Sequence, residues 1–75
     1  MSIKVKDWKA LQINDEIAKY HWVLCRHNNN DGTYTLNGRI NKETEKAINV
    51  TLDTETYGEH AREYTTWIPK SCVVA

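Results

Sequence analysis

The chain has 75 residues, and ten Lys and Arg side chains balance ten Asp and Glu side chains, so its formal net charge is zero. A chain of this length forms one domain (residues 1–75), which buries only about 60% of its unfolded surface and leaves little room for a deep substrate pocket. The neutral balance argues against a strongly basic nucleic-acid binder, whose affinity depends on neutralising phosphates. No apolar run is long enough to cross a membrane.

The N-terminal third allows two interpretations. IKVKDW fits a first strand, and NDEIAKYHWVL fits either a helix capped by Asn14 or a loop that leads into a strand from Tyr20. We favour a short helix over residues 14–21. The opening MSIKVKDW has no apolar segment of the kind that export signals carry, so we expect a cytoplasmic protein with reduced cysteines.

Alternating segments follow. In TYTLNGRI (33–40), Tyr, Leu, Gly and Ile share one face, and EKAINVTL (45–52) alternates in the same way, which is typical of half-buried strands. The polar residues 41–44 between them suit a hairpin connection. The turn-forming pair Asp31-Gly32 predicts another hairpin, in which YHWVLCR (20–26) pairs with residues 33–40.

The C-terminal part contains a polar segment and a last strand. Between Leu52 and Tyr64 the chain is acidic and shows no period, so we expect a long, mobile hairpin loop with a short helical turn over 59–63. The next strand is expected at YTTWIP (64–69), continuing into CVV. Pro69 has no N–H group to donate, which favours a sheet edge or a strand end at that position.

Two neighbours in this last strand, Trp67 and Ile68, must face opposite sides, so one of them should leave the core. A strongly curved sheet in so small a domain can bury both, and tryptophan usually supplies core area. We therefore expect a structural role for Trp67, unless the strand places Ile68 inside and Trp67 in solvent.

These elements predict a mainly β domain, or α+β if the N-terminal helix forms. We expect a small curved antiparallel sheet or an SH3/OB-like barrel of three to five strands with at most one short helix, since closure removes exposed strand edges. The expected core consists of apolar side chains from all of these segments: Trp8, Leu11, Ile17, Leu24, Leu36, Ile40, Ile48, Val50, Leu52, Ile68 and Val73.

Two segments, ETEKAINVTL (43–52) and TTWIPKS (65–71), resemble a motif pair of small bacterial, phage and prophage proteins of unknown function. In those proteins a Glu-Thr-Glu-Lys-Ala strand is followed, after a loop, by a Trp-Ile-Pro-Lys-Ser strand. The resemblance implies a small β domain in a bacterial host cell and brings no activity and no site residues. The long segment at 53–64, and Cys72 after the serine, depart from that pattern.

Cysteine and histidine supply the only candidates for metal binding or nucleophilic catalysis. A Cys and His set can hold zinc tetrahedrally, but no Cys-x-x-Cys or His-x-x-x-His pair is present, and the alternative is that the cysteines are small buried hydrophobic residues. A Cys–His pair can also form a nucleophile, but no third group or Gly-rich phosphate loop accompanies it. We expect no catalytic activity and no cofactor. The weak metal candidates are Cys25, His27, His60 and Cys72.

The remaining hypothesis is a binding surface. Small β-barrels stack the bases of single strands on aromatic residues beside Lys and Arg, whereas edge strands and aromatic surfaces with Arg are ordinary protein contacts. Since the net charge is zero, we expect a non-catalytic binding or accessory domain with a protein partner, and a homodimer through an edge strand is one form of it. The alternatives are a single-stranded nucleic-acid binder and a zinc-stabilised mini-domain. The candidate binding residues are Trp67, Lys70, Arg39, Arg26, Trp22 and Tyr34.

Overall fold

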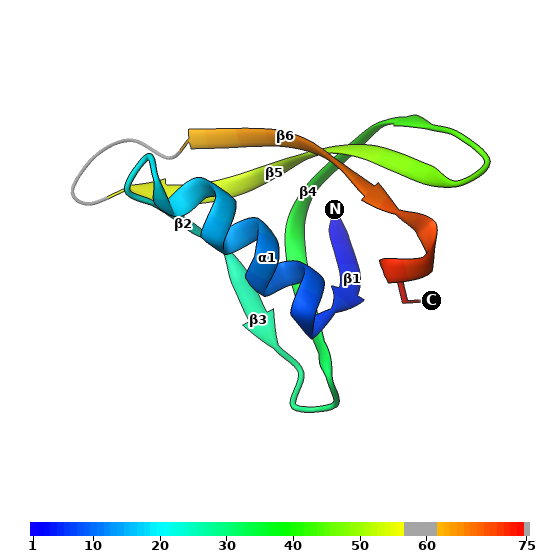
Figure 1. The fold of residues 1–75 in the computed structure, drawn as a ribbon, viewed down its shortest axis with the longest axis horizontal. Helices are drawn as coiled ribbons and strands as arrows, with labels where there is room; N and C mark the ends of the chain where they lie inside the picture. Colours follow the sequence, from blue (N-terminus) through cyan, green and yellow to red (C-terminus); the bar gives the residue numbers. More distant parts are fainter. Residues whose placement is uncertain (57–61, 75) are drawn as a thin grey trace.

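Figure 1 shows the computed structural model, which describes residues 1–56 and 62–74. The described residues form one helix and one six-stranded antiparallel sheet, which confirms the mainly β prediction with more strands than expected. In chain order the elements are β1 (Ser2–Lys6), α1 (Asp7–Ala18), β2 (Trp22–Leu24), β3 (Arg26–Asn28), β4 (Thr33–Glu43), β5 (Ala47–Thr56), β6 (Arg62–Pro69) and the 3-10 turn η1 (Lys70–Cys72).

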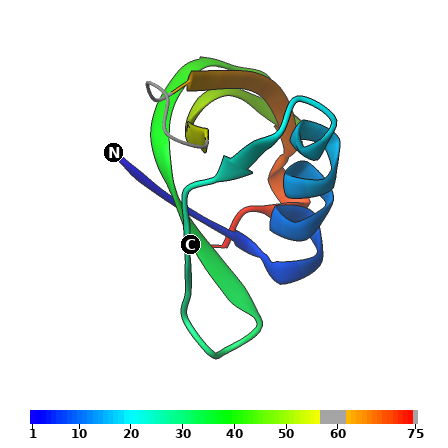
Figure 2. The same cartoon turned by 90° about the vertical axis from the view of Figure 1, so that its left-hand side faces the viewer.

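The long strand β4 organises the sheet, because its two halves have different neighbours. Its first half pairs with β1 on one edge and with β3 on the other, and its second half pairs with β5. Strand β6 pairs with the far edge of β5. A β-bulge between Ile40 and Lys42 shifts the register of β4 against β5. Figure 2 shows β4 curving around one side of the molecule, with α1 on the other.

Strands β2 and β3 fill the space where β4 and β5 diverge. Strand β2 pairs with the end of β5, and β3 pairs with the start of β4. Between the two strands, the Cys25 amide donates a hydrogen bond to the Asp53 carbonyl oxygen at 3.2 Å. The prediction that residues 20–26 pair with 33–40 is therefore only partly correct, because residues 22–24 pair with the end of β5 instead.

Gly38 of β4 lies in close main-chain contact with β5. A Cβ atom at this position would overlap the main-chain carbonyl oxygen of Thr51. Glycine is therefore required here by the contact between the two strands and not by a left-handed backbone conformation.

The C-terminal segment reaches back to the first strand. After η1, Val73 forms an isolated bridge with Val5, and the Val74 amide donates to the Lys4 carbonyl oxygen at 2.8 Å. The sheet remains open, and this bridge joins the chain that follows β6 to β1. Of the two predicted architectures, the strongly curved sheet is the one observed.

The helix begins at Asp7 and ends at Ala18, so the prediction of a short helix over 14–21 is wrong in position and length. The side chains of Ala10, Ile13 and Ile17 recur at helical spacing and are all buried. The predicted cap, Asn14, lies inside the helix, and its Oδ1 accepts a hydrogen bond from the Leu24 amide at 3.0 Å. Asn14 therefore holds β2 against α1.

Three residues expected in the core lie outside it. Trp8 and Leu11 are 55% and 43% exposed, because they fall beside the buried stripe of α1. Ile40 is exposed because β4 extends beyond the core from residue 39 onward. Val73 is only half-buried against the core. The observed core consists of Ile3, Val5, Ala10, Ile13, Ile17, Leu24, Leu36, Ile48, Val50, Leu52, Ile68 and Cys72.

The prediction of a loop over residues 53–64 is wrong at both ends, which lie in strands. Strand β5 continues to Thr56 and β6 begins at Arg62, because Asp53 pairs with Glu63 and Thr54 pairs with Arg62. Of the predicted helical turn over 59–63, residues 59–61 lie outside the described residues. In the part of the chain that the structure covers, no helix has the length and apolar character needed to traverse a membrane.

Candidate functional site

Trp67 lies on β6 and points away from the core. Its neighbour Ile68 is fully buried, whereas the Trp67 side chain is 47% exposed. Because directly opposed residues of antiparallel strands share a face, Trp67 continues a row that contains Asn49 of β5 and Lys42 of β4. The structure therefore places Ile68 inside and Trp67 in solvent, which is the condition under which a contact role was expected.

The surface around Trp67 is polar, and its side chains bind one another across three strands. Arg39 Nη1 donates to Glu63 Oε2 at 2.5 Å, which links β4 to β6. Asn41 Nδ2 donates to Thr51 Oγ1 at 2.8 Å, and the hydroxyl groups of Thr51 and Thr65 are 3.0 Å apart. We call this surface the outer face; it comprises Arg39, Asn41, Lys42, Asn49, Thr51, Glu63, Thr65 and Trp67.

The two cations that were predicted to bind a partner near this surface both have carboxylate partners. Arg39 pairs with Glu63, and Lys70 Nζ lies 2.7 Å from Glu43 Oε2. Exposed ion pairs of this kind contribute only about 0–1 kcal/mol, so a partner can open them. A phosphate group, however, would have to compete with these carboxylates for both cations.

The other predicted binding residues lie on a different part of the molecule. Arg26 Cζ is 5.9 Å from the centre of the Tyr34 ring, within the range of a cation–π contact. Arg26 also donates to the Leu24 carbonyl oxygen at 3.3 Å, so its guanidinium group is already engaged by the chain. These residues border an open groove lined by Val23, Leu24, Cys25, Arg26, Asn28, Tyr34 and Glu55.

Trp22 has a mainly structural position. Its ring lies 4.9 Å from that of Tyr20, centre to centre, and its side chain packs against the core. The six predicted binding residues thus separate into three places. Arg39 and Trp67 share the outer face with Lys70 next to it, Arg26 and Tyr34 border the groove, and Trp22 supports the core.

The two cysteines are free thiols. Burial raises the pKa of Cys25, and the negative charges of Glu55 and Asp53 raise it further. A raised pKa keeps this thiol protonated at neutral pH, and the thiolate is the nucleophilic form of cysteine. Cys72 is buried in the core, as the hydrophobic alternative expected.

No metal site is formed by the residues that the structure describes. Within residues 1–56 and 62–74, no three His, Cys, Asp or Glu side chains are placed to hold one ion. Cys72 belongs to η1 and His27 is exposed on β3. The fourth metal candidate, His60, lies outside the described residues.

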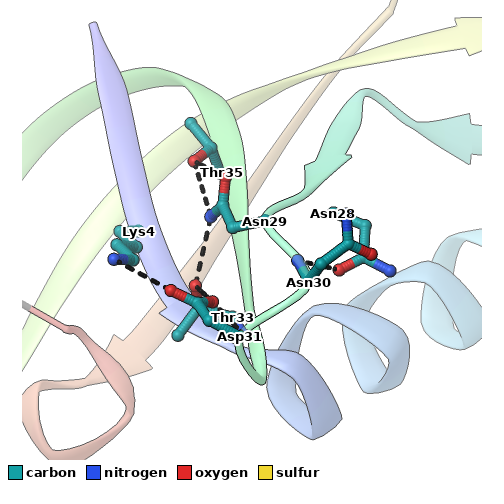
Figure 3. Close-up of polar contacts among 7 residues, drawn as sticks. All are labelled: Lys4, Asn28, Asn29, Asn30, Asp31, Thr33 and Thr35. Carbon is teal, nitrogen blue, oxygen red and sulfur yellow. Dashed lines mark hydrogen bonds and ion pairs between the residues drawn. The ribbon is translucent and has the colours of Figure 1, made fainter.

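The Asn-rich turn between β3 and β4 is stabilised by hydrogen bonds among its own side chains, as Figure 3 shows. The Asp31 carboxylate accepts hydrogen bonds from the Thr33 amide and hydroxyl at 3.1 and 2.5 Å, and it pairs with Lys4 at 3.5 Å. Asn29 Nδ2 donates to the hydroxyl groups of Thr33 and Thr35. The predicted turn is confirmed, and Asn30 and Gly32 have the positive φ angles that it requires.

Sequence reasoning missed the partner of Arg39. Glu63 is 24 positions away along the chain, and only the register of β4, β5 and β6 brings the two side chains together. The alternating pattern of Trp67 and Ile68 was the available signal for the outer face, and it left open which of the two would be buried.

No family model matches the chain, and no curated protein and no solved structure matches it.

Proposed function

We propose that this protein is a small non-catalytic binding domain whose outer face contacts a protein partner. The observation that carries the proposal is Trp67, which is 47% exposed beside a fully buried Ile68. A tryptophan on a strand offers a large apolar area with few rotatable bonds, and Trp and Arg are enriched at the energetically important positions of protein interfaces. Arg39 shares the same face.

The charges around Trp67 favour a protein over a nucleic acid. Arg39 and Lys70 each have a carboxylate partner, and Asp53 adds a further negative charge on the neighbouring strand. Binding of a single strand would require its phosphates to displace these carboxylates, and the net charge of zero gives no long-range attraction. A single-stranded nucleic acid is therefore the second candidate ligand.

Two further parts of the proposal concern chemistry and setting. The protonated thiol of Cys25 supports a role without nucleophilic catalysis. The likeness of residues 43–52 and 65–71 to the motif pair of small bacterial and phage proteins supports a place in the cytoplasm of a bacterial host cell.

Site-specific photo-crosslinking tests the proposed surface. A benzophenone amino acid replaces Trp67 in one variant and Trp8 in a matched control, because Trp8 is at least as exposed, at 55% against 47%, but lies on α1. We expect protein adducts in producing cells from position 67 and none from position 8. Equal adducts from both positions, or none from position 67, would overturn the proposal.

A fluorescence titration separates the two candidate ligands. Addition of a mixed single-stranded oligonucleotide at low salt should leave the tryptophan emission of the protein unchanged. Quenching that salt reverses, and that Trp67→Leu but not Trp8→Leu abolishes, would replace the protein partner by nucleic acid.

A further inference from the structure

Strand β6 forms an unpaired edge of the sheet. It pairs with β5 over its whole length, from Ala47↔Pro69 to Thr54↔Arg62, and no other described strand pairs with its far side. It has no bulge in its register against β5, and no lysine lies between Arg62 and Pro69. Natural proteins protect long strand edges with bulges, lysines and prolines, because an unprotected edge is a template for another strand. Of these devices β6 has only Pro69, at its last position.

The hydrogen bonds at the two ends of β6 show which main-chain groups point to the free edge. The Lys70 amide donates to the Lys46 carbonyl oxygen at 2.8 Å, and the Arg62 carbonyl oxygen accepts from Thr54 Oγ1. In an antiparallel pair every second residue bonds the same neighbour, so the even-numbered residues of β6 face β5. The N–H and C=O groups of Glu63, Thr65 and Trp67 therefore point outward.

Pro69 has the same parity as these three residues. Its missing N–H group would also point to the free edge, so proline is tolerated at this position without any loss to the pairing with β5. The same proline ends the row of outward donors, which limits a pairing strand to the part of the edge before it.

We infer that a second copy of this chain pairs with the free edge of β6, antiparallel and centred on Thr65. In this register Thr65 faces Thr65 of the second copy, and Glu63 of each copy faces Trp67 of the other. Each of these pairs exchanges two main-chain hydrogen bonds, so every outward donor of β6 is used. The two sheets then become one continuous sheet with a two-fold axis at Thr65.

The side chains fit this register. No like charges face one another, since Glu63 lies opposite Trp67, and Arg62 lies opposite Ile68. Trp67 is placed over the Arg39–Glu63 ion pair of the second copy, where its ring can cover the guanidinium group of that pair. Self-pairing therefore gives the exposed Trp67 a defined contact. It also joins the small sheets of the two copies into one larger sheet, which supports a domain with a small core.

Other registers are less favourable. A shift that centres the pair on Thr66 places Glu63 opposite Pro69, which has no N–H to donate. A shift that centres the pair on Glu63 places two carboxylates directly opposite one another, which is destabilising.

Charge substitution at the two-fold axis tests this inference. Sedimentation velocity would compare the wild type with Thr65→Lys, Thr65→Glu and an equal mixture of the two variants. Thr65 is exposed, so each substitution adds a charge that faces the same charge of the second copy across the two-fold axis. The control is Asn37→Lys, which adds the same charge at an exposed position of β4, paired with Ser2.

We expect a wild-type dimer that dissociates on dilution, and a dissociation constant raised at least about tenfold in each Thr65 variant. The mixture should recover the dimer, and Asn37→Lys should match the wild type. A monomeric wild type at high concentration, or a dimer that neither Thr65 variant weakens, would overturn the inference.

Amide hydrogen exchange provides a second measurement that does not depend on the variants. In the dimer the amides of Glu63, Thr65 and Trp67 should be protected, and this protection should fall on dilution, whereas the amides of Tyr64 and Thr66 stay protected by β5. Unprotected odd-numbered amides at every concentration would contradict the pairing.

The inference rests on the proposed function only in giving Trp67 a contact role, and the two can fail separately. Crosslinks from position 67 to a different protein, with a monomeric wild type, would leave the outer face as a contact surface and remove the dimer. Crosslinks from position 67 to the chain itself alone would identify the second copy as the partner.

Discussion

Two regions of the molecule contain similar polar side chains but differ in their role. One is the turn between β3 and β4, and the other is the outer face of β4, β5 and β6. In the turn, Asn29 and Asp31 bond hydroxyl and main-chain groups of their own hairpin, and no large apolar side chain is left in solvent. On the outer face, a similar network of Thr, Asn and Arg groups surrounds the exposed Trp67. The turn therefore has a structural role, because its polar groups bind one another. The outer face is suited to bind a partner, because it also exposes a large apolar side chain.

The largest expected effect is on the free energy of unfolding, and it distinguishes the adjacent residues Trp67 and Ile68 of β6. Ile68→Ala removes a fully buried side chain and should lower the free energy of unfolding by about 2–5 kcal/mol. Trp67→Ala should change it by less than about 1 kcal/mol, because half of that ring is already in water. Urea unfolding followed by circular dichroism measures both, and a comparable loss in Trp67→Ala would mean that Trp67 is structural.

The next effect concerns the network of the outer face. Thr51 is buried and binds both Asn41 and Thr65 through its hydroxyl. Thr51→Val keeps the shape and the β-branch, so it removes only these hydrogen bonds, and we expect a loss of about 0.5–1.5 kcal/mol in urea unfolding. An unchanged stability would show that the network orders the face without stabilising the fold.

The matching substitution in the turn is Asn29→Ala. It removes the hydrogen bonds to the hydroxyl groups of Thr33 and Thr35, which should cost about 1 kcal/mol. Crosslinking from position 67 should remain as in the wild type. If Asn29→Ala abolished those crosslinks while the protein stayed folded, the turn would belong to the contact surface and the comparison would fail.

The smallest effect is a pH dependence confined to the turn. The hydrogen bond from the Thr33 side chain, followed by the charge of Lys4, lowers the pKa of Asp31 in the folded state. The stabilisation is therefore fully present above the unfolded pKa of about 3.9 and is lost as the pH falls through the lower folded value. The difference in melting temperature between the wild type and Asp31→Asn should be constant near neutral pH and shrink in acid. A constant difference down to low pH would contradict the assigned contacts.

Much of the fold follows from local patterns. The alternation in residues 33–40 and 45–52 predicts β4 and β5 within a few residues, and Asp31-Gly32 predicts the turn before β4. The helix was misplaced because Asn14 looks like a cap, whereas the spacing of Ala10, Ile13 and Ile17 is the pattern that the core uses. The two short strands β2 and β3 were merged, because no local signal shows that a chain changes partner at Cys25.

The sequence by itself determined a small β-rich fold of zero net charge, and that either Trp67 or Ile68 must leave the core, because side chains of a strand alternate. Only the tertiary structure decided which of the two is exposed, that Arg39 reaches Glu63, and that β6 is an edge with Glu63, Thr65 and Trp67 pointing outward. These features depend on strand register and sheet order, which join residues far apart in the chain and leave no mark in any short segment.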